Sequence, residues 1–126
     1  GIHCLVNVVT ESEGSPAAVL IPALDPMDGI PTMRRRRARE ARGRRTADGT
    51  VPTSELCRGP GNLTMAMGIT LAENRLDLTG GRLYIEDRRV EPGSILWGPR
   101  IGIRVGTEQP WRAWLDGHPA VSRARP

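Results

Sequence analysis

Phenylalanine and lysine are absent from this 126-residue chain, which has one Tyr, three Trp and two Cys. Two cysteines do not make the disulfide framework of a small secreted domain. Neither Cys4 nor Cys57 belongs to a CxxC pair or stands at metal-ligand spacing from His3 or His118. We therefore expect both to be small buried hydrophobic residues in a reducing compartment. The apolar runs are too short to cross a bilayer and no signal peptide is recognisable, which predicts a cytoplasmic protein with no membrane partner.

Because lysine is absent, all 18 basic residues are arginines. A GC-rich genome produces the same bias, so the bias carries no weight as evidence for phosphate binding. The net charge of the chain is +4. The segment Arg34–Arg45, with eight Arg and one Glu, carries +7, so the rest of the chain carries −3 (4 minus 7) and the basic character is local. Two interpretations of this segment stay open: a solvated, frayed helix and loop, or an electrostatic patch that attracts a polyanion.

Motifs for chemistry are also lacking. The chain has no GxGxxG, Walker or zinc motif and no visible nucleophile–base pair. Its candidate acid–base residues, Asp25, Glu55 and Glu86, stand at turns or strand edges without an evident partner. The residues alone therefore predict a nucleic-acid-binding α+β domain without a metal site, and they leave open whether it is part of an enzyme.

The most informative segment is the turn Gly59-Pro60-Gly61. Proline suits the first helical position, and Leu63 and Met67 then fall on one face of a helix that we expect to end at Gly68. The backbone donors at this helix start, beside Arg58, could hold a phosphate. The alternative is a turn followed by a helix that faces the core.

Strand patterns flank this segment. Residues 4–10 and 17–21 predict an antiparallel hairpin whose second strand is fully buried, with Pro22 at its end. A helix is expected from Pro31 into the arginine run. Residues 82–86, 100–105 and 110–115 alternate like strands, with Ile101 and its neighbours facing inward. Trp111 and Trp114 could stack on bases, but we favour packing in the core or at its rim.

Six segments, taken in order, resemble the alkyladenine (3-methyladenine, methylpurine) DNA glycosylase family. They are GIHCLVNVV (1–9), AVLIPALDP (18–26), LCRGPGNL (56–63), PRIGI (99–103), PWR (110–112) and GHPAVS (117–122). The resemblance implies an α+β fold, with a curved antiparallel sheet and a few short helices in a single domain. Residues 1–126 resemble the C-terminal part of that domain. Since strand-like sequence begins almost at once, we expect a chain that is truncated at its N-terminus.

The resemblance also implies an activity. Such an enzyme flips an alkylated or deaminated purine out of double-stranded DNA and hydrolyses its N-glycosidic bond in base-excision repair. It works as a monomer without a cofactor, here in the cytoplasm of a bacterium, near the nucleoid. The family's catalytic glutamate has no match in this chain, so we expect the fragment alone to be inactive.

Site residues follow from matched positions. Asn7 matches the asparagine of the base pocket, whose amide helps to exclude guanine. The backbone carbonyl of Ile101 matches a position that helps to place the attacking water. The residues expected to contact DNA are Ile2, Arg58, Gly59, Gly61 and Arg100.

Two positions depart from the family pattern. Pro22 replaces an arginine that helps to hold the water, and Asn62 replaces a lysine expected near a phosphate. Two rival functions therefore stay open. One is a non-catalytic DNA-binding module of the same fold, and the other, based on the arginine run alone, is a basic protein of the translation apparatus.

Overall fold

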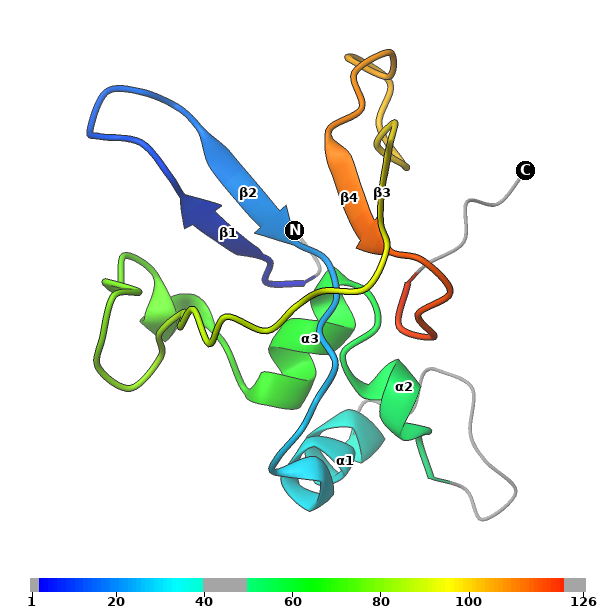
Figure 1. The fold of residues 1–126 in the computed structure, drawn as a ribbon. Coiled ribbons are helices and arrows are strands. Elements are labelled where there is room, and N and C mark those ends of the chain that lie inside the picture. Colours follow the sequence, from blue (N-terminus) through cyan, green and yellow to red (C-terminus); the bar gives the residue numbers. More distant parts are fainter. Residues whose placement is uncertain (1–2, 40–49, 122–126) are drawn as a thin grey trace. The chain divides into compact units, whose positions relative to one another are not determined.

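The computed structural model describes residues 3–39 and 50–121. The chain divides into two compact units, unit 1 (Gly1–Asn74) and unit 2 (Arg75–Pro126), and each is described by itself (Figure 1). Within the described ranges, no helix is both long enough and apolar enough to span a bilayer.

Unit 1 opens with the predicted hairpin. Strand β1 (Val6–Val9) pairs antiparallel with β2 (Ala18–Ile21), in a register that sets Val6 opposite Ile21. These two residues pack against the core of the unit, so one face of the hairpin is covered. Pro22 follows directly after β2, where its missing N–H costs no ladder hydrogen bond.

The expectation that the second strand is fully buried is wrong. Val19 is 53% exposed and Leu20 is 42% exposed. The reason is that β2 pairs with β1 alone among the described residues. An apolar run bounded by turns indicates burial on both faces only when a second layer covers the strand.

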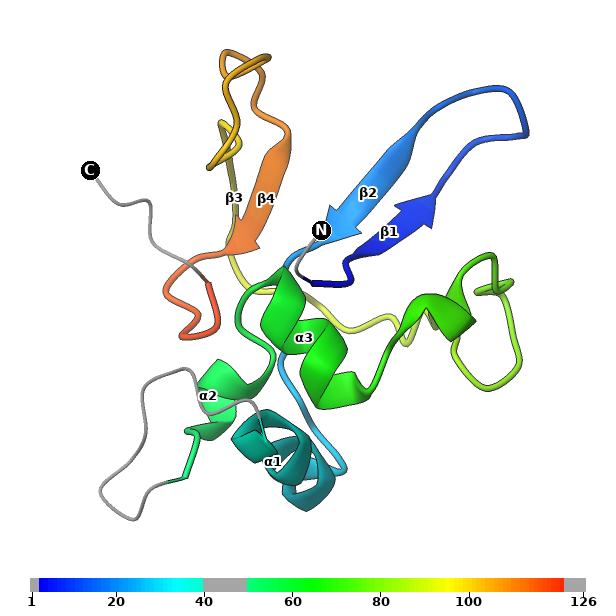
Figure 2. The same cartoon turned by 180° about the vertical axis from the view of Figure 1, so that it is seen from behind.

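Three helices follow, α1 (Ile30–Arg39), α2 (Thr53–Leu56) and α3 (Pro60–Met67), with a 3₁₀ turn at Leu71–Glu73. The helices pack on one another (Figure 2). Their contact buries an apolar cluster made of Val51, Leu56, Cys57, Leu63 and Ala66. The predicted helix after Gly59 and its inward Leu63 are confirmed, whereas α2 was not predicted.

The arginines of α1 are largely part of this packing. Arg34 donates to the hydroxyl of Thr53 (3.0 Å), and Arg36 donates to the carbonyl of Ala66 (3.0 Å). Arg37 is only 5% exposed. These three side chains join α1 to α2 and α3, so a frayed, fully solvated helix is the wrong interpretation of this part of the run. Residues 40–45 lie outside the described residues.

In unit 2, strand β3 (Ile95–Gly98) pairs antiparallel with β4 (Arg112–Leu115). A hydrogen bond from Asp116 N to Ser94 O (2.8 Å) extends the ladder. Strand β4 confirms the strand predicted within residues 110–115, and β3 was not predicted.

The other two strands predicted in this unit are wrong. In 82–86, Tyr84 and Ile85 are 53% and 60% exposed, and Ile85 N bonds to Leu78 O (2.9 Å) in a loop rather than a ladder. In 100–105, Gly102 has φ +77°, which turns the chain and ends the alternation. Ile101 is accordingly 46% exposed instead of facing inward.

The predicted fold class, α+β with few short helices and antiparallel pairing, is confirmed. Within the described residues the pairing forms two separate two-stranded sheets, one in each unit.

Candidate nucleic-acid interface

The start of α3 is the first part of the candidate site. Gly59 precedes the helix with φ +95°, Pro60 occupies its first turn, and no side chain caps it. The amides of Gly61 and Asn62 stand in the first turn, where an α-helix offers them no acceptor. Such a helix start carries a partial positive charge that suits an anion.

Its neighbours hold this turn in place. Arg58 forms an antiparallel bridge with Ala23, and Leu24 N donates to Cys57 O (3.3 Å). The side-chain amide of Asn62 donates to Arg58 O (2.7 Å). Asn62, which replaces the expected lysine, therefore stabilises the turn instead of offering a charge.

The chain that enters β1 crosses this helix start closely. A Cβ on Gly61 would lie 2.9 Å from Cγ of His3, so only glycine leaves room for the imidazole. Farther along, the buried hydroxyl of Thr64 donates to Cys4 O (3.0 Å). These contacts fix the approach to β1 relative to α3. No motif or spacing in the sequence indicates the contact between His3 and Gly61.

The outer face of the β1–β2 hairpin is the second part. Asn7 stands opposite Leu20, and alternation adds Leu5, Val9 and Ala18 to the same face. All five residues are exposed, with Leu5 at 51% and Val9 at 69%. The Asn7 amide has no hydrogen-bond partner in the part of the chain that the structure describes. An amide beside exposed apolar side chains offers one hydrogen-bonding group and an apolar contact surface to a flat ligand.

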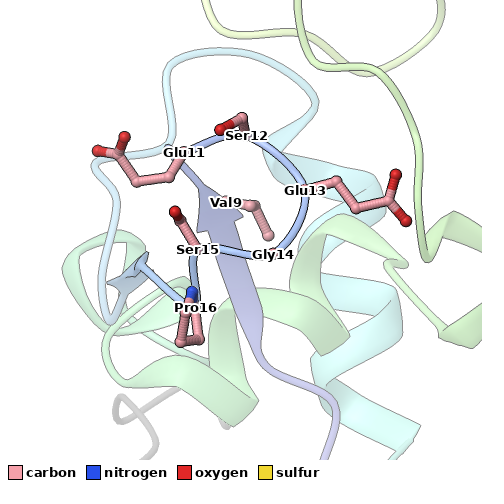
Figure 3. Close-up of a pocket in the computed structure, with 7 residues that line it drawn as sticks. All are labelled: Val9, Glu11, Ser12, Glu13, Gly14, Ser15 and Pro16. Carbon is pink, nitrogen blue, oxygen red and sulfur yellow. The ribbon is translucent and has the colours of Figure 1, made fainter.

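The loop that joins β1 to β2 encloses a small hollow (Figure 3). Its lining is Val9, Glu11, Ser12, Glu13, Gly14, Ser15 and Pro16. The carboxylates of Glu11 and Glu13 point away from each other on opposite sides of the loop (Figure 3). Two negative charges oppose a phosphate here, so this hollow is not part of the candidate interface.

Acid–base and metal chemistry have few candidates in the described residues. Burial raises the pKa of the Cys57 thiol, which the nearby Arg37 only partly offsets, so the thiol stays protonated. No cluster of three or more His, Cys, Asp or Glu side chains within residues 3–39 and 50–121 could hold a metal ion.

The predicted site residues are divided between the units. Asn7, Arg58, Gly59 and Gly61 lie in unit 1, where the structure links the approach to β1 with the start of α3. In unit 2, Arg100 stacks over the Trp111 ring at 5.9 Å from its centroid, and the exposed Ile101 occupies the loop after β3. Ile2 lies outside the described residues. Their roles in binding and water placement stay predictions.

Comparison with known proteins gives this geometry a context. The family model described as Methylpurine-DNA glycosylase matches residues 1–119. The chain belongs to the methylpurine-DNA glycosylase family. The resemblance inferred from the six segments is thereby confirmed.

Individual relatives in this glycosylase family are similar to nearly the whole chain. One from Rhodopseudomonas palustris (strain BisB18) is 44% identical over 123 residues, and one from Mycolicibacterium paratuberculosis is 42% identical over 125 residues. A third, from Burkholderia orbicola (strain MC0-3), is 42% identical over 129 residues. All three carry the provisional name 3-methyladenine DNA glycosylase. They align with 98%, 99% and 100% of this chain, which spans 56%, 56% and 58% of their own lengths.

Proposed function

We propose that this chain is part of a DNA glycosylase that removes alkylated or deaminated purines, such as 3-methyladenine, from double-stranded DNA. The supporting observation is the family match over residues 1–119, together with the position of Asn7 within an open apolar face. In this proposal the protein acts as a monomer, without a cofactor, in the cytoplasm of a bacterium close to its nucleoid.

The proposed division of labour follows the two parts of the site. The start of α3, with Arg58 beside it, holds a backbone phosphate. The outer face of the hairpin contacts the flipped base, and the Asn7 amide crowds the exocyclic amine of guanine. Flipping costs a few kcal/mol, less for a damaged base, which by itself favours lesions.

The bond-breaking step joins water to C1′ of the sugar as the C1′–N9 bond breaks. The purine leaves with a proton, and the sugar keeps the hydroxyl as an abasic site. The resemblance assigns activation of this water to a glutamate that matches no residue here, and its placement to the Ile101 carbonyl. Pro22, which has neither charge nor N–H, offers the water nothing in place of the usual arginine.

The test separates binding from chemistry. A chimaera in which these 126 residues replace the matched region of the Rhodopseudomonas palustris relative is incubated with duplexes that contain hypoxanthine, and abasic sites are revealed with alkali. Lesion-specific strand breaks are expected from the chimaera, and none from the 126-residue chain alone. A chimaera that releases no base while the intact relative does so contradicts the enzymatic proposal.

A second candidate is a non-catalytic DNA-binding module, and Pro22 is the observation that favours it. This candidate predicts that the chimaera binds duplex DNA with an affinity that falls steeply with salt, yet makes no abasic product. Replacing Pro22 with Arg then distinguishes the two candidates. Activity that is regained with Arg indicates that Pro22 alone removed the chemistry.

A further inference from the structure

Residues 99–111 form the loop that joins β3 to β4 in unit 2 (Figure 1). The Arg100 guanidinium at one end of the loop lies over the Trp111 ring at the other end, 5.9 Å from the ring centroid. This distance is within the range of a cation–π contact. Gly102 (φ +77°) and Gly106 (φ +70°) turn the chain between the two residues. The turns thus bring the two ends of the loop together.

The pair of Arg100 and Trp111 lies at the surface, unlike the other arginine–tryptophan pair of this unit. Trp111 is 66% exposed, and Arg100 is exposed as well. Arg112 and Trp114, which stack at 4.5 Å, are both half-buried. The Trp114 ring lies so close to Gly98 that a Cβ there would stand 3.0 Å from it. The covered pair is therefore part of the packing of the hairpin, whereas packing does not account for the exposed Trp111 ring.

Arg100 has no ion-pair partner in the part of the chain that the structure describes, and its stacking on Trp111 is its one side-chain contact there. A cation–π contact uses the flat face of a guanidinium and leaves the N–H groups at its edge able to donate. A planar fork with unused donors matches the oxygens of a phosphate. The stacked Arg100 is therefore suited to bind a phosphate while the contact with Trp111 stays in place.

The charge of the loop favours the same kind of ligand. Arg104 is exposed and adds a second cation, against the single carboxylate of Glu108 in residues 99–111. A local excess of positive charge attracts a polyanion. Duplex DNA, the substrate of the proposed function on which this inference rests, is such a polyanion.

We propose that Trp111 is a positioning residue that holds Arg100 for contact with a phosphate of the DNA backbone. An exposed arginine samples many rotamers and loses that freedom when it binds a ligand. A guanidinium that is already stacked on a ring has part of this freedom removed before DNA arrives, so binding costs less. Trp111 thus acts through Arg100 and does not itself contact the DNA.

The experiment titrates the 126-residue chain into a fluorescein-labelled duplex that contains one hypoxanthine, and fluorescence anisotropy gives the dissociation constant at several salt concentrations. Arg100→Ala is expected to reduce the slope of log affinity against log salt by about one, the effect of one lost phosphate contact. Trp111→Ala is expected to weaken binding about two- to fivefold, the size of an exposed cation–π contact. In the Arg100→Ala background, Trp111→Ala is expected to have no further effect.

Two further variants separate positioning from a general effect on the loop. Trp111→Phe keeps an aromatic face and is expected to restore most of the affinity that Trp111→Ala loses. Trp97→Ala is the matched control, because Trp97 is 68% exposed and no arginine of the described residues stacks on it. It is expected to leave the affinity unchanged, and a loss equal to that of Trp111→Ala overturns the proposal.

Circular dichroism establishes that each variant is folded. If Trp111→Ala does not fold, Trp111→Leu, which keeps apolar bulk but has no aromatic face, takes its place in the cycle with the same expected result.

Three more results overturn the proposal. They are an unchanged affinity after loss of the Trp111 ring, a loss of equal size with and without Arg100, and an unchanged salt slope after Arg100→Ala. A chain that binds no duplex even at low salt overturns it together with the proposed DNA substrate. If the cycle gives the expected result but the chimaera releases no base, the enzymatic part of the proposed function fails and the role of Trp111 stands.

Discussion

Arg36 of α1 lies directly against Gly68, the residue at which α3 ends. Gly68 has φ +72°, and its N–H donates to Met65 O (3.2 Å) while the Arg36 guanidinium donates to Ala66 O (3.0 Å). A cation at the C-terminal end of a helix both satisfies free carbonyls and opposes the negative end of the helix dipole. One member of the arginine run therefore stabilises the helix that carries the candidate phosphate site.

The first prediction tests this arrangement with Gly68→Ala. A Cβ at this position would lie 2.7 Å from Cζ of Arg36, and the left-handed conformation costs a non-glycine residue about 1–2 kcal/mol. We expect the free energy of unfolding to fall by at least this amount in urea denaturation. Gly80→Ala is the matched control, since nothing lies within 4 Å of a Cβ there and its φ is ordinary. Equal losses in the two variants contradict the prediction.

The second prediction concerns the contact between His3 and Gly61. Alanine favours a helix over glycine by roughly 0.5–1 kcal/mol, but its Cβ would meet the imidazole at 2.9 Å, and such overpacking costs about 1–3 kcal/mol. Because the His3 Cβ would itself lie 3.0 Å from the new Cβ, the clash is removed only by glycine at position 3. We expect Gly61→Ala to destabilise the native chain and to stabilise the His3→Gly variant. Urea denaturation of the four proteins of this double-mutant cycle measures the reversal. The same sign in both backgrounds shows that the two residues do not meet.

The sequence predicted the elements whose signals are local. The turn at Gly59 and Pro60, the inward Leu63 and the stop at Gly68 are all decided within one helix, and all are confirmed. Whether Leu20 is buried depends on what packs over the strand, and an apolar run in the sequence cannot reveal that. The strand is present as predicted, but the face that carries Leu20 is exposed.

The same distinction explains the arginines and the site. Arg36 and Gly68 are 32 positions apart, and no helical period connects them. The base-pocket role of Asn7 is predicted because its neighbours form a family motif, and it stays a prediction, since an isolated asparagine does not indicate a base pocket. The contact between His3 and Gly61 likewise joins distant positions, so only the structure reveals it.

The third prediction concerns the Cys57 thiol. Burial raises its pKa, so the folded chain holds this proton at a pH where the unfolded chain has lost it. The free energy of unfolding should therefore fall as the pH rises above the usual thiol pKa, about 8.5, toward the raised value. Cys57→Ala should lose this part of the pH dependence, as measured by urea denaturation between pH 7 and 10.

An independent measurement checks the same thiol. Cys57 is 1% exposed whereas Cys4 is half-buried, and both are free. At pH 8 we expect iodoacetamide to modify Cys57 about tenfold more slowly than Cys4, or slower still, because a buried thiol is seldom a thiolate. Equal rates in the native protein, with both accelerated by urea, contradict the assignment.

The fourth prediction follows from the proposed function and concerns Asn7. Its amide is exposed on the hairpin face opposite Leu20, so Asn7→Ala should leave the free energy of unfolding nearly unchanged. In the chimaera with the Rhodopseudomonas palustris relative, loss of the amide should admit undamaged guanine. We expect the preference for hypoxanthine over guanine to fall by roughly tenfold or more, since steric and hydrogen-bond discrimination of this kind amounts to about 1–3 kcal/mol.

The matched control for Asn7 is Val9→Ala, which trims a residue on the same face that is 69% exposed. This change removes the same apolar contact from every purine. It should therefore lower the release of hypoxanthine without changing the preference for hypoxanthine over guanine. The measurement is the ratio of single-turnover rates on duplexes that differ only in the target purine. If both variants change the ratio equally, the face contributes general contact and Asn7 has no special part in excluding guanine. If Asn7→Ala alone changes it, the amide itself discriminates between the bases.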